Sequence, residues 1–403
     1  GLSLALTATG LAIRERLQAG RRAAFAQAFG QEAERLEALS RYAHLAPAHD
    51  LAREGRALRE RVARLEAQVR SGGPVAEGPG AYALGRAHLA LGSLDEARRN
   101  LERALSAGFR SGDLSAALGR TLGALYLREA DLAHAISQPE LRAARLRALD
   151  QDLLQPAVAH LRAGRGATLE PPAYLEGLIA FFEGRPEAAL GRLDEVSASE
   201  PWFYEARRLV GEIRLQEAHR TSDFPLRQVH LAQAGEAFEG ARVIAPSDPA
   251  LLVGLARRWR DQMTLEGERG RSSEQAFQAL EGACEALRRL DPSGASAPTF
   301  LAAGLVERGR NRALFRKPPE PLYRQALATV EGLPPEAETT LVRARILTSL
   351  AGVAIERGQP ALPLLQEATQ QAELALGLVP RNLRAFALRW ELASLTFEVR
   401  QRA

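Results

Sequence analysis

The amino-acid sequence predicts an all-α fold built from repeated helical hairpins. Alanine, leucine, arginine and glutamate dominate the 403 residues, and all four are strong helix formers. The β-branched residues that a sheet needs are scarce, and aromatic residues make up 5% of the chain. Glycine, alanine and leucine also recur at fixed intervals, which is typical of stacked helix pairs.

The charge pattern argues against nucleic acid as the main partner. The net charge is +4, and Lys317 is the single lysine beside many arginines. Arginine alternates with acidic residues along the predicted helices, as in residues 53–61, which suits pairs of opposite charge one helical turn apart. Nucleic-acid-binding proteins usually gather positive charge in one stripe or tail. We therefore expect a protein or peptide partner.

The sequence predicts neither an enzyme active site nor a metal site. Cys284 is the sole cysteine, which leaves no disulfide framework and no thiolate metal site. His44 and His49 lie close in sequence, with Asp50 beside them, but the break at Pro47 favours capping or packing over metal binding. No phosphate-binding loop, nucleophile elbow or paired-cysteine motif occurs. We expect no cofactor, and we expect Cys284 to be a core residue.

The first segment, residues 1–16, allows two interpretations. Residues 1–13 carry no charge, and Arg14 and Arg16 follow them. This apolar run is too short to span a bilayer by itself. The segment is therefore either the end of a membrane helix that starts upstream and anchors the chain, or the first buried helix of the protein.

Two further segments precede the repeats. Residues 17–70 are strongly helical and carry a break at Pro47, which predicts a long helical hairpin. Residues 71–80 contain four glycines and two prolines in two clusters, Ser71–Pro74 and Gly78–Gly80, which predict a linker.

Two stretches beyond this segment share one ladder of spacings. In the first stretch, Gly85 is followed by Ala97, Leu101 and Ala104. The same intervals recur in the second stretch, which starts at Gly177. The glycine lets the two helices of a hairpin approach closely, and the first alanine lies where they cross. This ladder is that of the tetratricopeptide repeat (TPR), a helix–turn–helix unit of about 34 residues.

Residues 81–403 predict a TPR-like array of about seven units, closed by a terminal helix over residues 385–403. Two units keep the regular spacing. In the others, more residues separate the first glycine from the later alanine and leucine positions, which we interpret as lengthened hairpin arms. These units start near Gly123, Gly211, Gly254, Gly304 and Gly352. Arrays of this kind wind into a right-handed superhelix whose concave face binds partners.

The candidate partner-binding residues follow from the ladder. Positions three before and one after each glycine are expected to face the concave side of the array. Trp202 is added because it belongs to an aromatic run, residues 201–204, which either packs between repeats or anchors a peptide. An acidic or aromatic-containing peptide is the favoured ligand. The candidates are Tyr82, Arg86, Arg120, Tyr174, Arg208 and Trp202.

Several short segments accompany the TPR ladder, namely residues 11–14, 29–32, 41–44, 49–50 and 82–86. With them, the whole chain resembles the region that follows the kinase domain and a membrane helix in large bacterial serine/threonine protein kinases. The resemblance implies a sensor or scaffold module that binds other proteins. The glycine-rich loop, the His-Arg-Asp loop and the Asp-Phe-Gly motif of the kinases are absent from this chain.

A second function stays open, that of a ligand- or peptide-sensing TPR domain in another bacterial signalling or transcription regulator. The compartment and the oligomeric state stay open too. The kinase resemblance implies repeats outside the membrane, whereas arginines after the apolar run favour the cytoplasmic side. The array is therefore either cytoplasmic or extracytoplasmic.

Overall fold

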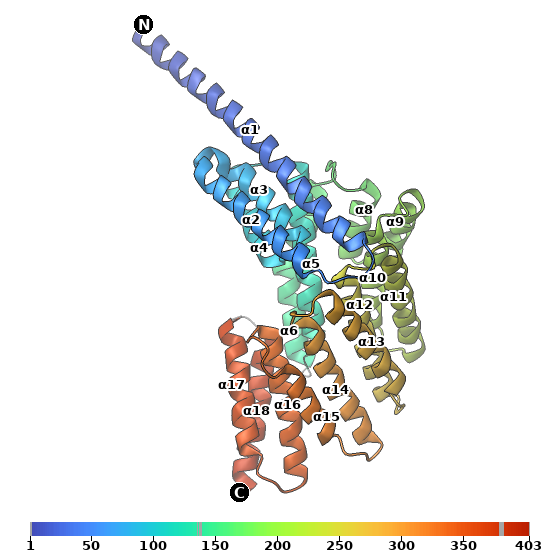
Figure 1. Ribbon diagram of the computed structural model, residues 1–403. Helices are drawn as coiled ribbons and strands as arrows, with labels where there is room; N and C mark the ends of the chain where they lie inside the picture. The colour runs from blue at the N-terminus through green and yellow to red at the C-terminus, as the bar shows by residue number, and fades with distance from the viewer. Residues whose placement is uncertain (1, 135, 137–138, 379–382, 403) are drawn as a thin grey trace. The chain divides into compact units, whose positions relative to one another are not determined.

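The protein is helical throughout the part that the structure describes. The computed structural model describes the backbone of residues 2–134, 136, 139–378 and 383–402, and the side chains of residues 16–133, 136, 139–378 and 385–401. Helices follow one another with short turns between them, and these residues contain no strand (Figure 1). The predicted all-α, helical-hairpin repeat fold is confirmed.

The chain forms two compact units, and each draws on separate stretches of sequence. Unit 1 comprises residues 1–46, 51–128 and 149–201. Its hairpins are α3/α4, α5/α7 and α8/α9, preceded by α1 and α2. The bounds are α1 Leu2–Leu45, α2 Ala52–Gly72, α3 Pro74–Ala90, α4 Leu94–Ser106, α5 Gly112–His134, the π-helical segment η1 Asp150–Leu154, α7 Gln155–Ala163, α8 Pro172–Phe182 and α9 Pro186–Ser199.

Unit 2 comprises residues 47–50, 129–148 and 202–403. It contains the last turns of α5, helix α6, four hairpins and the helix α18 that follows them. The bounds are α6 Pro139–Leu149, α10 Tyr204–Arg220, α11 Phe224–Ile244, α12 Pro249–Glu268, α13 Glu274–Leu290, α14 Ser296–Leu314, α15 Glu320–Val330, α16 Ala337–Glu356, α17 Leu362–Leu378 and α18 Leu383–Arg402.

The ladder glycines lie beneath large side chains of neighbouring helices. A Cβ added at Gly85 would lie 2.6 Å from Leu101, which is far inside van der Waals contact. The ring of Phe238 lies over two ladder glycines. A Cβ at Gly211 would lie 2.6 Å from its Cε1 atom, and one at Gly254 would lie 2.7 Å from it. The absence of a side chain at these positions is therefore what lets α10, α11 and α12 pack together.

The last ladder glycine, Gly352, differs from the others. A Cβ added there meets no atom within 4 Å. Its hairpin, α16/α17, is held instead by small residues that include Ala351, Ala368 and Ala372, packed with leucines of α16, α17 and α18. The predicted role of the ladder glycine therefore does not extend to this unit.

Helix α1 is the longest helix of unit 1 and contacts the unit through its second half. Phe29, Ala33 and Leu36 pack against α2 and α3, whereas residues 16–22 are exposed and extend past those helices (Figure 1). Among the described residues, no helix is long and apolar enough to cross a membrane. Both interpretations of residues 1–13 concern side chains outside the described residues.

The predicted linker over residues 71–80 is wrong for most of its length. Helix α2 continues to Gly72, and α3 begins at Pro74, so only Gly73 separates them, with a φ of 65°. Gly73 serves this turn, whereas Gly72, Gly78 and Gly80 serve close packing. A Cβ at Gly80 would lie 2.4 Å from Val69 Cγ2 on α2. Composition alone does not distinguish these two uses of glycine.

Cys284 lies on α13 and is buried, as predicted for a core residue. Burial raises the pKa of its thiol to about 12. At pH 8 the reactive thiolate is therefore about one part in ten thousand of the native thiol. We expect a thiol reagent to leave Cys284 unmodified in the native protein at pH 8 and to modify it fully in urea. Rapid modification of native protein would contradict this burial.

Candidate functional site

The structure places two candidate residues, Tyr82 and Arg86, together on α3. The Arg86 guanidinium donates hydrogen bonds to both carboxylate oxygens of Glu37 on α1, from Nε at 2.8 Å and from Nη2 at 2.6 Å. It also lies 5.6 Å from the centre of the Tyr82 ring, which stacks on Phe109. Burial raises the pKa of Tyr82 to about 12. With 5% of Arg86 exposed, this pair is part of the packing of unit 1.

Arg120 and Tyr174 also belong to unit 1. Arg120 forms an ion pair with Glu170, which precedes α8. Tyr174, in the first turn of α8, is buried. Both side chains therefore contact their own unit, with little surface left for a partner.

Arg208 and Trp202 belong to unit 2. The Arg208 guanidinium lies 3.6 Å from the carboxylate of Asp248, which caps the start of α12. Trp202 meets the Phe203 ring edge-on at 6.0 Å, yet 56% of Trp202 is exposed. Trp202 is thus the most accessible of the six candidates, and the role of the whole set stays a prediction.

The histidine pair at the α1–α2 bend shows a local contact. His49 Nδ1 lies 2.8 Å from the carbonyl oxygen of Pro47. In the described part of the chain, no group of three or more His, Cys, Asp and Glu side chains is arranged to hold a metal ion.

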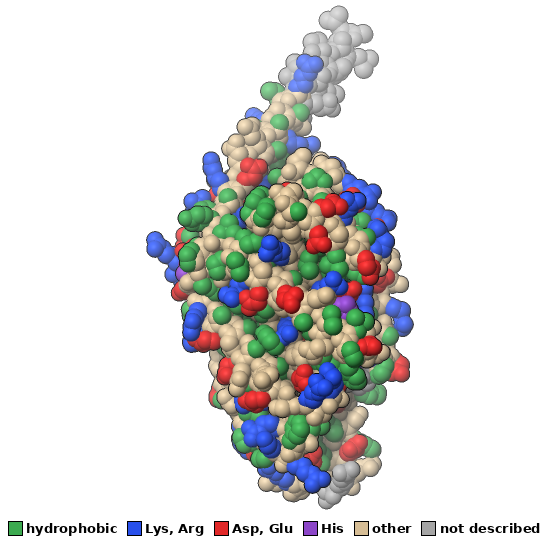
Figure 2. All heavy atoms as spheres, turned by 90° about the vertical axis from the view of Figure 1, so that its right-hand side faces the viewer, with side chains coloured by type: hydrophobic (Ala, Val, Ile, Leu, Met, Phe, Trp, Pro, Cys, Tyr) green, Lys and Arg blue, Asp and Glu red, His purple; other side chains and the backbone are tan. Residues whose placement is uncertain are grey.

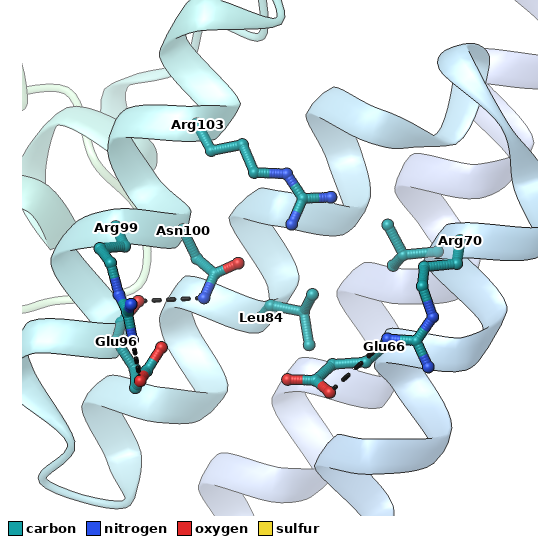
Figure 3. Close-up of a pocket in the computed structure, with 8 residues that line it drawn as sticks. Glu66, Arg70, Leu84, Glu96, Arg99, Asn100 and Arg103 are labelled. Atoms are coloured by element: carbon teal, nitrogen blue, oxygen red, sulfur yellow. Dashed lines mark hydrogen bonds and ion pairs between the residues drawn. The ribbon is translucent and has the colours of Figure 1, made fainter.

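An open groove in unit 1 was not foreseen from the sequence. It has a volume of about 340 Å³ and lies between α2 and α4, with α3 beneath (Figure 3). Val69 and Leu84 are buried side chains that contribute apolar surface to it. The lining residues are Glu66, Val69, Arg70, Leu84, Glu96, Arg99, Asn100 and Arg103.

Three arginines and two glutamates give the groove its charge. Arg103 is firmly held, because its Nε and Nη2 atoms donate to the two carboxylate oxygens of Glu77 at 2.5 and 3.0 Å. The hydrogen bond from Arg103 lowers the pKa of Glu77. Arg70 and Arg99 pair with Glu66 and Glu96, one turn away on their own helices. The sequence shows these arginines as ordinary helix-surface residues, because nothing local indicates that α2 and α4 lie on either side of one groove.

A second charged site, in unit 2, joins three helices. Arg257 on α12 donates from Nη1 to both carboxylate oxygens of Glu212 on α10, at 3.0 and 2.9 Å. Its Nη2 atom donates to Asp131 on α5 at 3.4 Å. Arg260 donates to both carboxylate oxygens of Asp131, at 3.2 and 3.3 Å, and to Asp261 at 3.4 Å. We call these residues, with His219, the α12 ion-pair network.

The network is largely buried, and its charges depend on one another. Burial by itself would lower the pKa of Arg257, but Asp131 and Glu212 outweigh burial and raise it. Burial would raise the pKa of Asp261, but His219, 2.8 Å away, and Arg260 outweigh that and lower it. Every charged group here already has a partner of opposite sign. The network therefore suits a structural clamp better than a binding or catalytic site.

Comparisons with known proteins give structural neighbours only. No protein-family model matches the chain, and no curated protein matches it. A human IFIT1 dimer with PPP-AAAA has a TM-score of 0.42 and 15% identity over 83% of this chain and 78% of that one. The C-terminal part of a TPR repeat-containing protein from Cytophaga hutchinsonii has a TM-score of 0.34 and 13% identity over 76% and 98%. The anaphase-promoting-complex assembly Cut9–Hcn1 has a TM-score of 0.36 and 13% identity over 88% and 62%. Similarity this weak carries no argument about what the chain binds.

Proposed function

We propose that this chain is a protein-interaction scaffold without a catalytic site of its own, and that the groove between α2 and α4 binds an acidic segment of a partner protein. The observation that carries the proposal is the groove itself, an open hollow that is lined by the apolar side chains Val69 and Leu84, three arginines and two glutamates. An extended peptide can place apolar side chains on the floor while its carboxylates reach the arginines.

Arg70 and Arg99 are the arginines that a partner can recruit. Their side chains are 70% and 69% exposed, and each pairs with a glutamate one turn away. Exposed pairs of this kind contribute about 0.3–0.5 kcal/mol, so a carboxylate of the partner can compete for either arginine at little cost. Arginine also binds carboxylates through two parallel hydrogen bonds, which adds specificity.

Arg103 and Asn100 shape the groove rather than supply free charge. Arg103 is already paired with Glu77 on α3. The Asn100 side-chain amide donates to the Glu96 carbonyl at 3.0 Å, which holds this side chain against α4. Both residues therefore present fixed surfaces, so a bound segment meets a preformed site and loses less affinity to ordering.

The proposal is tested by titrating the protein into fluorescein-labelled peptides rich in aspartate and glutamate, beside matched peptides rich in lysine. We expect fluorescence anisotropy to show preferential binding of the acidic peptides, weakening with added salt. The double variant Arg70→Glu/Arg99→Glu is expected to lower the affinity at least about tenfold, which corresponds to about 1.4 kcal/mol.

The matched control carries the same change in net charge away from the groove. Arg98, on α4, pairs with Glu102, and Arg128, on α5, pairs with Asp95; neither lines the groove. Arg98→Glu/Arg128→Glu should therefore leave binding within about twofold of the parent protein. Equal weakening by both double variants, or equal binding of acidic and basic peptides, would refute the proposal that the groove binds an acidic segment.

The six candidate residues named from the sequence remain a second proposal for partner binding. Arg86 and Tyr174 are buried, so their replacement disturbs folding before it reports on binding. Trp202 is accessible, and Trp202→Ala in the same titration separates the surfaces. A loss of affinity with Trp202→Ala, and none with the groove variant, would favour binding at Trp202 over binding in the groove.

We further propose that the scaffold belongs to a membrane-anchored bacterial serine/threonine kinase, as the resemblance of residues 11–86 implies. The decisive observation is the coding sequence upstream of Gly1. A kinase domain followed by an apolar segment that continues into residues 1–13 is expected there. Another type of domain would redirect the proposal to a different signalling or transcription regulator.

A further inference from the structure

The turn between α14 and α15 carries an unbalanced charge. Residues 308–319 contain five basic residues and no acidic one, the largest such run in the chain. Two of the five, Arg308 and Arg310, pair with carboxylates of their own unit. Arg312, Arg316 and Lys317 form no ion pair within the part of the chain that the structure describes. This differs from the face of the molecule in Figure 2, where positive and negative side chains are intermixed.

The neighbouring α12/α13 turn extends this positive surface. The Asn311 side-chain amide donates to the Arg271 carbonyl oxygen at 2.7 Å, and its own oxygen accepts from the Ser273 backbone N–H at 3.1 Å. The two turns therefore lie side by side (Figure 1). Arg269 and Arg271 also form no ion pair among the described residues. We define the basic turn edge as Arg269, Arg271, Arg312, Arg316 and Lys317.

The carboxylates around the basic turn edge leave it positive. Glu268, Glu274 and Glu320 already pair with arginines that do not belong to the edge. Glu266, near the end of α12, and Glu356, at the end of α16, are the other acidic residues next to these turns. They offset two of the five positive charges, so an excess remains.

Arg316 occupies a backbone position where the neighbouring turns have glycine. Its φ is 56°, and it is the one non-glycine residue with a positive φ among those that the structure describes. The equivalent residues of the α12/α13 and α16/α17 turns are Gly270 and Gly358, both with a φ of 64°. In all three turns the next residue donates its N–H to the carbonyl oxygen five residues earlier. A side chain strains this left-handed conformation, so an arginine here indicates a role other than folding.

Two apolar side chains lie beside these charges. Leu314 and Phe315 are 59% and 44% exposed, within a tip whose residues 313–318 are all exposed. Whatever covers these two side chains must also receive positive charge. The interface of an anionic lipid bilayer does both, because its acyl chains accept apolar side chains and its headgroups attract arginine and lysine. A nucleic acid would bind the charges but would leave Leu314 in water.

We propose that the basic turn edge, together with Leu314 and Phe315, docks unit 2 onto anionic lipid membranes. The two apolar side chains enter the boundary between headgroups and acyl chains, and the five cations lie at the level of the headgroups. Each basic residue near an anionic membrane raises partitioning roughly fivefold. Docking should therefore require anionic lipid and weaken with added salt. It is independent of the groove, which belongs to unit 1.

A fluorescent label at the tip tests whether this turn makes the contact. Leu314→Cys in the full chain is labelled with a nitrobenzoxadiazole at pH 8, where we expect the buried Cys284 to stay unlabelled. With phosphatidylcholine vesicles containing about a third phosphatidylserine, we expect stronger, blue-shifted emission as the label leaves water. Phosphatidylcholine alone should give no such change. Val243→Cys, at a residue of α11 that is 82% exposed, is the control and should stay in water.

Charge variants identify the residues responsible. Arg271→Ser/Arg316→Gly/Lys317→Ser should lower the ratio of partitioning into anionic and neutral vesicles roughly a hundredfold. Arg316→Gly alone should lower this ratio and also raise the urea midpoint of unfolding, because glycine adopts a positive φ without strain. An arginine kept for folding would lower that midpoint on replacement. Residues 1–13 carry no charge, so neutral vesicles measure any contribution that they make.

The exposed arginines of α1 provide the matched control. Arg16→Ser/Arg21→Ser/Arg22→Ser removes the same charge and should change the ratio less than the roughly fivefold that one charge contributes at the membrane. An equal loss in both triple variants would overturn the proposal, as would unchanged emission at position 314 with anionic vesicles. Binding of polyglutamate or single-stranded RNA through the turn residues, without binding of vesicles, would replace the membrane with that partner.

Discussion

Replacing Phe238 with alanine is expected to lower the free energy of unfolding by about 3–5 kcal/mol. Phe238 is completely buried on α11, with its ring against Gly211 of α10 and Gly254 of α12. The ring therefore fills space in two consecutive hairpins at once. Its removal leaves a cavity that helices on both sides border, and neither glycine has a side chain to fill it. Urea unfolding followed by circular dichroism measures the loss.

The control for Phe238 lies on the same helix. Val243 is 82% exposed, so Val243→Ala should change the free energy of unfolding by no more than about 0.5 kcal/mol. The glycines supply a second check. Gly254→Ala alone should destabilise the protein, because its Cβ would lie 2.7 Å from the Phe238 ring. In the double variant with Phe238→Ala that clash is gone, so the two costs should not add. Additive costs would show that the ring and the glycine are not in contact.

The hairpins were predictable from sequence because their determinants are local and steric. Each regular hairpin contains its own determinants. These are a glycine beneath a large side chain, an alanine where the helices cross and a glycine in the turn. Gly92 and Gly184, in the turns of the two regular units, have φ values of 71° and 75°, a conformation that favours glycine. The linker predicted over residues 71–80 failed for residues 74–80, because glycine also serves close packing there. Gly80 packs against Val69 on the preceding helix, and Gly78 packs against Phe109, just after α4.

The candidate sites were less predictable because they depend on which helices become neighbours. The ladder selects Arg86 as a partner-facing position, but it does not show that Glu37, 49 residues earlier, pairs with it. Asp131 and Arg257 are separated by 126 residues, and no spacing in the sequence links them.

Replacing Asp131 with asparagine is expected to destabilise unit 2 by about 3–5 kcal/mol, the usual cost of breaking a buried ion pair by removing one partner. Asp131 accepts hydrogen bonds from both Arg257 and Arg260. Asparagine keeps the shape but removes the charge, so two arginines are left with Glu212 and Asp261 as their remaining carboxylates. Because buried arginine cannot lose its proton, the loss of the carboxylate that both arginines share is relieved only by opening the structure or admitting water.

The matched comparison is Asp95→Asn, which removes the carboxylate of the exposed Asp95–Arg128 pair. That pair is screened by solvent, so the free energy of unfolding should change by less than about 1 kcal/mol. Replacing Asp131, Glu212, Arg257 and Arg260 together with apolar residues of similar volume should recover much of the stability lost in Asp131→Asn, because Asp261 then keeps His219 as its partner and the other charges are gone. If Asp131→Asn costs no more than Asp95→Asn, the network is solvated and does not clamp α5 to α12. If the fourfold variant is worse than the single one, the charges themselves stabilise the contact between these helices. Urea unfolding of the parent protein and the three variants at one pH distinguishes these outcomes. The comparison of Asp131→Asn with Asp95→Asn reports on desolvation of the network. The comparison of the fourfold variant with Asp131→Asn reports on attraction between the charges.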